Sequence, residues 1–136
     1  MELLKYSFSW SDFPLARNEM YKYLRDYSLF SEVTLVCNDD KHIKAHKVIL
    51  SSFSSLFKRM FVNNQHPQPI IFLRGVAIND LDAILDFIYY GEASVAQENF
   101  SSFLETASDL EIEELSTFSN ETENSKVRLG FIQNKT

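Results

Sequence analysis

The sequence predicts an α+β domain in which a small sheet lies beside a cluster of five or six helices. Some segments alternate apolar and polar residues with a period of two, which is typical of strands. Others repeat apolar residues every three or four positions, which is typical of helices. The chain has only three glycines and three prolines, which argues against a loop-rich sandwich. Its 136 residues are 45% hydrophobic, enough for one domain with a substantial core.

The expected strands come from the alternating segments. Aromatic residues alternate with serines over residues 6–10, which predicts a strand that must find a partner elsewhere. Residues 32–37 alternate again, a turn signal follows at 38–40, and residues 42–45 return, so a hairpin is expected. The remaining expected strands are a short buried one and a very short one, at residues 70–73 and 93–95.

The first helices are expected around a proline and a serine cluster. Phe13 precedes a proline, so it is expected to end the extended piece. Residues 15–27 form an amphipathic pattern in which Met20, Tyr23 and Leu24 share a face. Residues 47–61 are apolar nearly all round but are interrupted by serines, which predicts two short buried helices.

The C-terminal half continues with helices and then changes character. Residues 79–90 give the clearest helical pattern, with Asn79 as the expected N-cap and Gly91 at the left-handed C-terminal position. Two further helices are expected, at residues 97–110 and 112–118. The remainder is polar, so we expect a domain over residues 1–117 and a flexible tail or linker over residues 118–136.

The net charge limits the possible partners, and the cysteine count indicates the cellular compartment. The formal net charge is -6, and no run of Lys or Arg exceeds two residues, so direct nucleic-acid contact is not expected. Cys37 is the single cysteine, which fits a reducing compartment. No signal-peptide core and no apolar stretch of roughly 20 residues is visible, so no membrane span is expected. The chain is predicted to be nuclear or, alternatively, cytoplasmic.

No catalytic, cofactor or metal site is predicted. The three histidines with Cys37 do not have metal-ligand spacing, and neither a glycine-rich phosphate loop nor a nucleophile elbow is present. Cys37 falls on the apolar face of its strand, where thiols are usually inert. His46, at a strand-to-helix junction, is expected to be a hydrogen-bonded structural residue.

Several motifs in order resemble the BTB/POZ family. They lie at residues 32–36 (EVTLV), 43–51 (IKAHKVILS), 55–57 (SLF), 60–61 (MF) and 87–92 (FIYYGE). The stretches 6–13 (YSFSWSDF), 61–64 (FVNN) and 68–73 (QPIIFL) are similar to the Tramtrack-type subgroup of arthropod transcription factors. The chain departs from these patterns at Glu32, where the family usually has Asp, at Ser9, where the subgroup usually has Arg, and at Gln65-His66, which replace a cysteine-containing turn.

The resemblance implies a homodimer in which the N-terminal strand is exchanged. That strand and the helix over residues 15–27 would pack on the second copy, with the strand pairing near residues 93–95; the alternative is that they fold back on their own chain. The subgroup also implies assembly beyond dimers, and an exposed edge strand is a template for it. The residues expected at the dimer interface are Tyr6, Phe8, Trp10, Phe13, Leu15, Met20, Tyr23 and Leu24.

A second site implied by the resemblance is a charged pocket at the dimer groove, formed by Glu32 and Lys44. The alternative for these two residues is a modest salt bridge across the hairpin. Neither alternative involves a cofactor.

The function implied is self-association of a transcription or chromatin regulator, which joins DNA-binding modules and recruits corepressors or other BTB domains. The alternative is a substrate adaptor for a cullin-type ubiquitin ligase. Such adaptors carry a hydrophobic residue and then a Glu after the Met-Phe pair, whereas here residues 62–65 read VNNQ. A small enzyme is the third possibility, disfavoured because no site is found.

Overall fold

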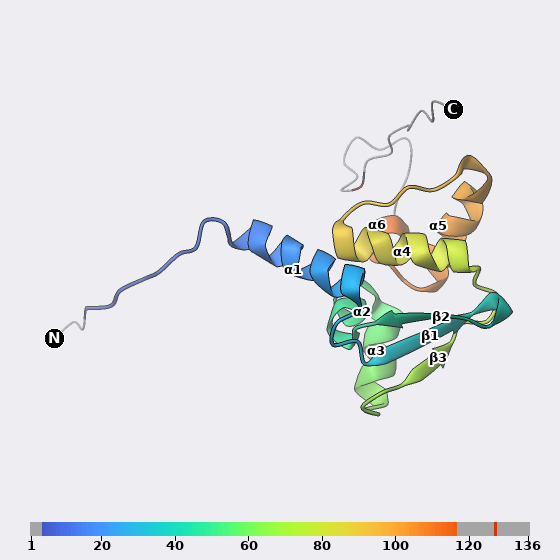
Figure 1. The fold of residues 1–136 in the computed structure, drawn as a ribbon, viewed down its shortest axis with the longest axis horizontal. Coiled ribbons are helices and arrows are strands. Elements are labelled where there is room, and N and C mark those ends of the chain that lie inside the picture. The colour runs from blue at the N-terminus through green and yellow to red at the C-terminus, as the bar shows by residue number, and fades with distance from the viewer. Residues whose placement is uncertain (1–3, 117–126, 128–136) are drawn as a thin grey trace.

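The computed structural model describes residues 4–116 and residue 127, and these residues form the expected α+β domain (Figure 1). A long extension precedes a body in which helices pack on one face of a small sheet. Two 3-10 turns, η1 (Asn38–Asp40) and η2 (Gln97–Asn99), lie between the main elements. Those elements are α1 (Phe13–Tyr27), β1 (Val33–Cys37), β2 (Lys41–Ala45), α2 (Lys47–Phe53), α3 (Ser55–Asn63), β3 (Ile70–Phe72), α4 (Ile78–Tyr90), α5 (Phe100–Asp109) and α6 (Glu113–Ser116).

The sheet has the strand order β2-β1-β3. The predicted hairpin is confirmed, because β1 pairs antiparallel with β2, while β3 adds parallel to the other side of β1. A short strand forms within residues 70–73 as predicted, but the prediction that it is buried was wrong. Ile70 and Phe72 are 62% and 75% exposed, because β3 is an edge strand and these two side chains lie on the face away from the helices.

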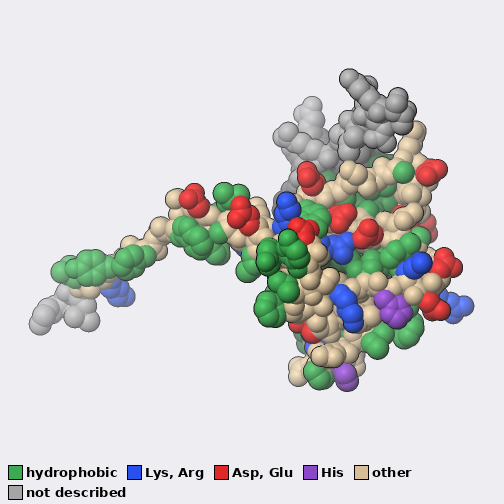
Figure 2. Space-filling model, viewed as in Figure 1, with side chains coloured by type: hydrophobic (Ala, Val, Ile, Leu, Met, Phe, Trp, Pro, Cys, Tyr) green, Lys and Arg blue, Asp and Glu red, His purple; other side chains and the backbone are tan. Residues whose placement is uncertain are grey.

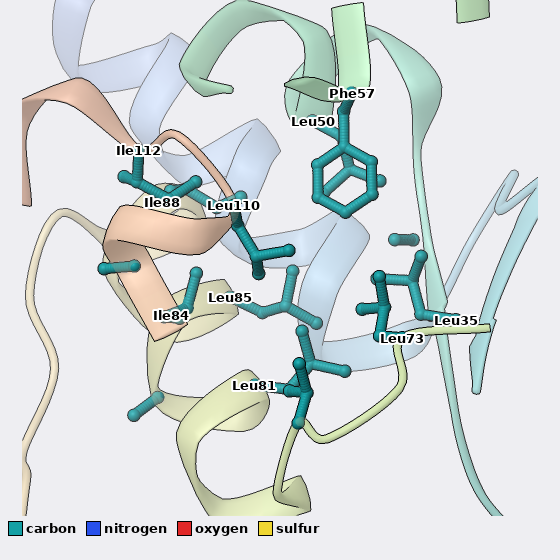
Figure 3. Packing of buried hydrophobic residues seen from close by; sticks show 14 of the residues in the cluster. Leu35, Leu50, Phe57, Leu73, Leu81, Ile84, Leu85, Ile88, Leu110 and Ile112 are labelled. Carbon is teal, nitrogen blue, oxygen red and sulfur yellow. The ribbon is translucent and has the colours of Figure 1, made fainter. Parts of the chain in front are cut away.

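The hydrophobic core lies between the sheet and the helices (Figure 3). Leu35 from the central strand and Phe57 from α3 point toward the buried face of α4, and α4 contributes Leu81, Ile84 and Leu85, each no more than 1% exposed. Because α4 packs along its length against the rest of the body, the other elements are positioned around it. The extended segment before α1 adds nothing to this core.

Ser54 separates α2 from α3, as the serine cluster predicted. It is 1% exposed, its Oγ accepts the Phe57 N–H at 3.0 Å as an N-cap, and its hydroxyl donates to the Leu110 carbonyl at 2.6 Å. A β-bridge joins Ser54 to Ile112, and Arg59 of α3 binds Glu111 through two hydrogen bonds. The junction of α2 and α3 is therefore tied to the C-terminal part of the domain.

Four predicted helix starts move by one to three residues. α5 begins at Phe100, because residues 97–99 form η2, and α6 begins at Glu113. α1 begins at Phe13 because Pro14 occupies the first turn, where its missing N–H is not needed. α4 begins at Ile78 with Ala77, not Asn79, at the N-cap. Gly91 ends α4 with a φ of 83°, which confirms the predicted left-handed cap.

The short strands predicted at residues 6–10 and 93–95 are not formed in the single chain. Residues 6–10 are exposed to solvent, and their pairing as a strand with a second chain stays a prediction. The predicted tail over residues 118–136 lies outside the described residues except for Val127, which is partly buried against the core. The domain boundary at residue 117 stays a prediction.

We expect Ser54→Ala to lower the free energy of unfolding by about 1–3 kcal/mol, because it removes an N-cap and leaves the buried Leu110 carbonyl without its donor. Chemical denaturation followed by circular dichroism measures this change. Ser52→Ala is the matched control, since Ser52 is exposed and donates only within its own helix to Val48. Equal effects of the two substitutions would contradict the role of Ser54.

Candidate interaction surfaces

The arm before α1 carries three large aromatic side chains in water. Tyr6, Phe8 and Trp10 are 87%, 96% and 64% exposed, and Figure 1 shows the arm extending away from the body. Trp10 has a ring contact, at 5.7 Å between centroids, with Phe13 at the start of α1. The arm does not fold back on its own chain, so the structure does not support that alternative.

The outer face of α1 continues this apolar surface. No residue of α1 is buried, and Leu15, Met20 and Tyr23 are all more than half exposed. Tyr23 stacks at a tilt on Tyr27, with 4.6 Å between ring centroids. Of the predicted interface residues, Leu24 differs, because it is partly buried against the chain's own core together with Tyr21. The correction is that Leu24 lies on the inward side of α1.

The loop after α1 adds an aromatic residue that the sequence pattern did not reveal. Phe30 is 83% exposed and has a φ of 58°, and Ser28, the C-cap of α1, has a φ of 50°. A bulky residue in the left-handed region is unfavourable. Figure 2 shows hydrophobic side chains gathered over the end of α1 and this loop. The apolar surface of the arm and α1 therefore extends onto the body.

Polar contacts fasten the C-terminal end of α1 to α4. The Arg25 guanidinium donates to the carboxylates of Asp82 and Asp86, the latter at 3.3 Å, and lies 6.0 Å from the centroid of the Tyr89 ring. The Tyr90 hydroxyl donates to Asp26 at 2.5 Å. Since α1 has no buried apolar residue, these contacts help set the direction in which it leaves the body.

The pKa values near Arg25 reflect crowding of acidic groups. Partial burial, with smaller contributions from Asp82 and Asp26, raises the pKa of Asp86 although Arg25 opposes this. Burial and the hydrogen bond to Asp26 raise the pKa of Tyr90 to about 12. Asp82 and Asp86 thus share one guanidinium while Asp26 binds the Tyr90 hydroxyl, and the negative charge of Asp86 is disfavoured in this cluster.

His46 is a buried structural residue, as predicted. It is 7% exposed; its Nδ1 lies 2.7 Å from the Tyr89 hydroxyl and its Nε2 lies 2.5 Å from the Leu29 carbonyl. The His46 backbone N–H donates to the same Tyr89 hydroxyl at 3.1 Å. A proton on Nε2 satisfies every group, because Nδ1 then accepts from the tyrosine. Burial raises the pKa of Tyr89, which keeps its hydroxyl a donor.

Glu32 and Lys44, the predicted charged pair, do not contact each other. Glu32 Oε1 accepts the backbone N–H of Lys47 at 2.5 Å, and Lys44 Nζ donates to Thr34 Oγ1 across the hairpin at 2.6 Å. Lys44 belongs to the exposed sheet face, whereas the residue that approaches Glu32 is Lys47. The charged pocket at a dimer groove therefore stays a prediction, and the alternative cross-strand salt bridge is wrong.

The single cysteine lies in an environment that disfavours reactivity. Cys37 is 6% exposed, its thiol faces the Lys41 carbonyl at 3.5 Å, and burial raises its pKa, so the reactive thiolate is disfavoured. Within residues 4–116 and at residue 127, no group of three or more metal-ligating side chains comes together. None of the helices in those residues is long and apolar enough to span a bilayer.

Comparison with known proteins identifies the fold and the family. Residues 21–126 match the family model of the BTB/POZ domain. The chain belongs to the BTB/POZ family. The BTB domain of zebrafish PATZ1 has the same fold, with a TM-score of 0.71 and 21% sequence identity, over 82% of this chain and 92% of that one.

Relatives in Drosophila melanogaster support the predicted subgroup of this BTB protein. The chain is 41% identical over 106 residues to Longitudinals lacking protein-like, covering 78% of this chain and 83% of that protein. It is 42% identical over 86 residues to Protein tramtrack, alpha isoform, covering 63% and 10%. It is 32% identical over 110 residues to Transcription activator GAGA, covering 81% and 19%. The chain therefore carries a protein-interaction domain homologous to those of transcription regulators, and it spans a small part of the last two proteins.

We expect Asp86→Asn to raise the free energy of unfolding at neutral pH by less than about 1 kcal/mol, since the side chain is 37% exposed. A carboxyl whose pKa is raised by folding binds its proton more tightly in the folded state, so its contribution to stability is present at low pH and is lost as the pH rises through the raised value. The advantage of the Asp86→Asn variant over the parent should therefore vanish in acid. Urea titrations at neutral and acidic pH measure it.

The matched control for this prediction is Asp82→Asn. Asp82 makes the closer contact with Arg25, so its neutralisation is expected to lower stability at neutral pH. If both substitutions lowered stability equally, crowding of acidic groups around Asp86 would not be the dominant effect.

Proposed function

We propose that this BTB domain is the self-association module of a transcription or chromatin regulator in the nucleus. The observation that carries the proposal is the exposure of Tyr6, Phe8 and Trp10 on an arm without a partner in its own chain. Burying three such side chains is worth roughly 4–6 kcal/mol before entropy costs. A second copy of the chain supplies the surface on which this free energy is gained.

The proposed interface consists of the arm and the outer face of α1. The arm becomes a strand when it pairs with the segment at residues 93–95 of the second copy, which satisfies backbone groups that one chain leaves open to water. Phe13, Leu15, Met20 and Tyr23 extend the contact along α1, and Phe30 continues it onto the body. Leu24 contributes indirectly, because it packs α1 against the core of its own chain.

The proposed mechanism is avidity. When two or more chains associate, the second DNA contact of the attached binding modules becomes intramolecular, which raises the apparent affinity by roughly 10² to 10⁴ fold. In this proposal the DNA-binding modules are separate from the BTB domain, and corepressors or other BTB domains add to the assembly. The cullin adaptor is not favoured by any feature of the described residues, while the relatives include Transcription activator GAGA.

We expect the parent chain to be a dimer or a larger species in light scattering across a concentration series, and the double variant Phe8→Asp/Trp10→Asp to lose assembly or solubility. Charged residues at these positions oppose burial in a shared apolar interface. Val62→Asp is the matched control, because Val62 is 62% exposed on α3, away from the arm, and assembly should persist. A folded, monomeric parent at micromolar concentration would refute the proposal.

A further inference from the structure

The face of the sheet away from the helices is bare and has a defined composition. Residues directly opposed across paired strands point to the same face. The register places Thr34 opposite Lys44 and Ile70, and Val36 opposite His42 and Phe72. The outer sheet face, as we call it, is thus formed by two rows of three side chains, Lys44–Thr34–Ile70 and His42–Val36–Phe72.

Exposure confirms that the described residues leave this face open. Val36 is only 4% exposed, since it lies beneath its neighbours on β2 and β3, whereas Ile70 and Phe72 project into solvent. Lys44 and His42 are exposed as well. Figure 2 shows hydrophobic, histidine and basic side chains side by side over the strands. The face therefore offers an apolar half on β3 and a basic half on β2.

The sign of the charge around this face is unusual for the chain. Residues 41–79 contain six of the thirteen Lys and Arg and none of the nineteen Asp and Glu, although the whole chain has a net charge of -6. Three of these six bases lie on or beside the strands, and the other three lie on α2 and α3. All three histidines fall in the same stretch. Lys41 and Arg74 are exposed at the ends of β2 and β3. Asp39 and Asp40 lie in the hairpin turn beyond one end of the face, and Glu32, two positions before Thr34, lies at the other end, where it accepts the backbone N–H of Lys47.

From this juxtaposition we propose that the outer sheet face binds an acidic peptide segment that also carries a large apolar side chain. The apolar residue packs on Phe72 and Ile70, and the carboxylates lie over Lys44 and His42. Strand spacing and rise place Phe72 and Lys44 about 12 Å apart. An extended peptide with an acid three or four positions from its apolar residue spans that distance. Such a partner adds to self-association, because the face is separate from the arm and α1.

Two features favour an acidic peptide as the ligand and the sheet face, rather than a strand edge, as its binding site. Pro67 and Pro69 precede β3, and Lys41 and Lys44 lie on β2, the other edge of the sheet. Prolines and lysines both protect an edge from strand addition, so the face rather than an edge is the site. A nucleic acid is held through several phosphate contacts, whereas the two rows of this face contain a single lysine, Lys44, beside the apolar side chains of Ile70 and Phe72. The described arm of a second copy, residues 4–12, carries one base and one acid, Lys5 and Asp12, and so lacks the required charge.

Fluorescence anisotropy with a labelled synthetic peptide tests the site. The probe is an extended peptide with one Leu and two Glu placed three and four positions beyond it, and its counterpart carries Lys in place of Glu. We expect binding of the acidic peptide and not of the basic one. Lys44→Glu should weaken binding by about fivefold or more, and Phe72→Ala by about tenfold.

Controls separate this proposal from others. Lys58→Glu makes the same charge change on α3, off the face, and should leave binding nearly unchanged; circular dichroism verifies that each variant folds. Equal binding of both peptides, displacement by a single-stranded DNA oligonucleotide, or a change of oligomeric mass in Phe72→Ala would each overturn the proposal, the last in favour of a second copy. Light scattering of the parent tests self-association independently, so the two proposals can fail separately.

Discussion

The buried imidazole of His46 is the point where the parts of this domain meet. It stands between β2 and α2, contacts the hydroxyl of Tyr89 on α4, and reaches the Leu29 carbonyl in the loop after α1. Unpaired buried polar groups are costly, so these elements hold their relative positions only together. The direction of α1, and therefore the position of the arm, depends on these hydrogen bonds of His46 and on the contacts of Arg25 nearby.

The domain separates its stabilising core from its interaction surfaces. The core lies between the sheet and α4, while α1 has no buried residue and the arm contacts its own chain only where Trp10 meets Phe13. The free energy needed to fold and the free energy available for association therefore come from different side chains. Residues at the interaction surfaces are free to vary in ways that change partners without unfolding the domain.

Periodicity predicted the hairpin, the two helices around Ser54 and the α4 cap at Gly91, because each depends on local pattern and on backbone preference. Exposure was harder to predict. Leu24 and Tyr23 are neighbours on a helix, yet only the first packs on the core, because the angle at which α1 leaves the body decides this. The left-handed conformation of Phe30 and the contact of Glu32 with Lys47 likewise have no signal in the residue pattern. The overall charge concealed the acid-free stretch at residues 41–79, since a net charge counted over the whole chain averages over segments of opposite sign.

The contacts of Ser54 and Arg59 with residues 110–112 bring together parts of the chain more than fifty positions apart. Contacts of long sequence separation close large loops at a cost in chain entropy and slow folding. During synthesis, α2 and α3 emerge well before the segment that completes their junction. The nascent domain therefore cannot complete its core until its last helices leave the ribosome. During that interval the aromatic arm is already exposed to neighbouring chains.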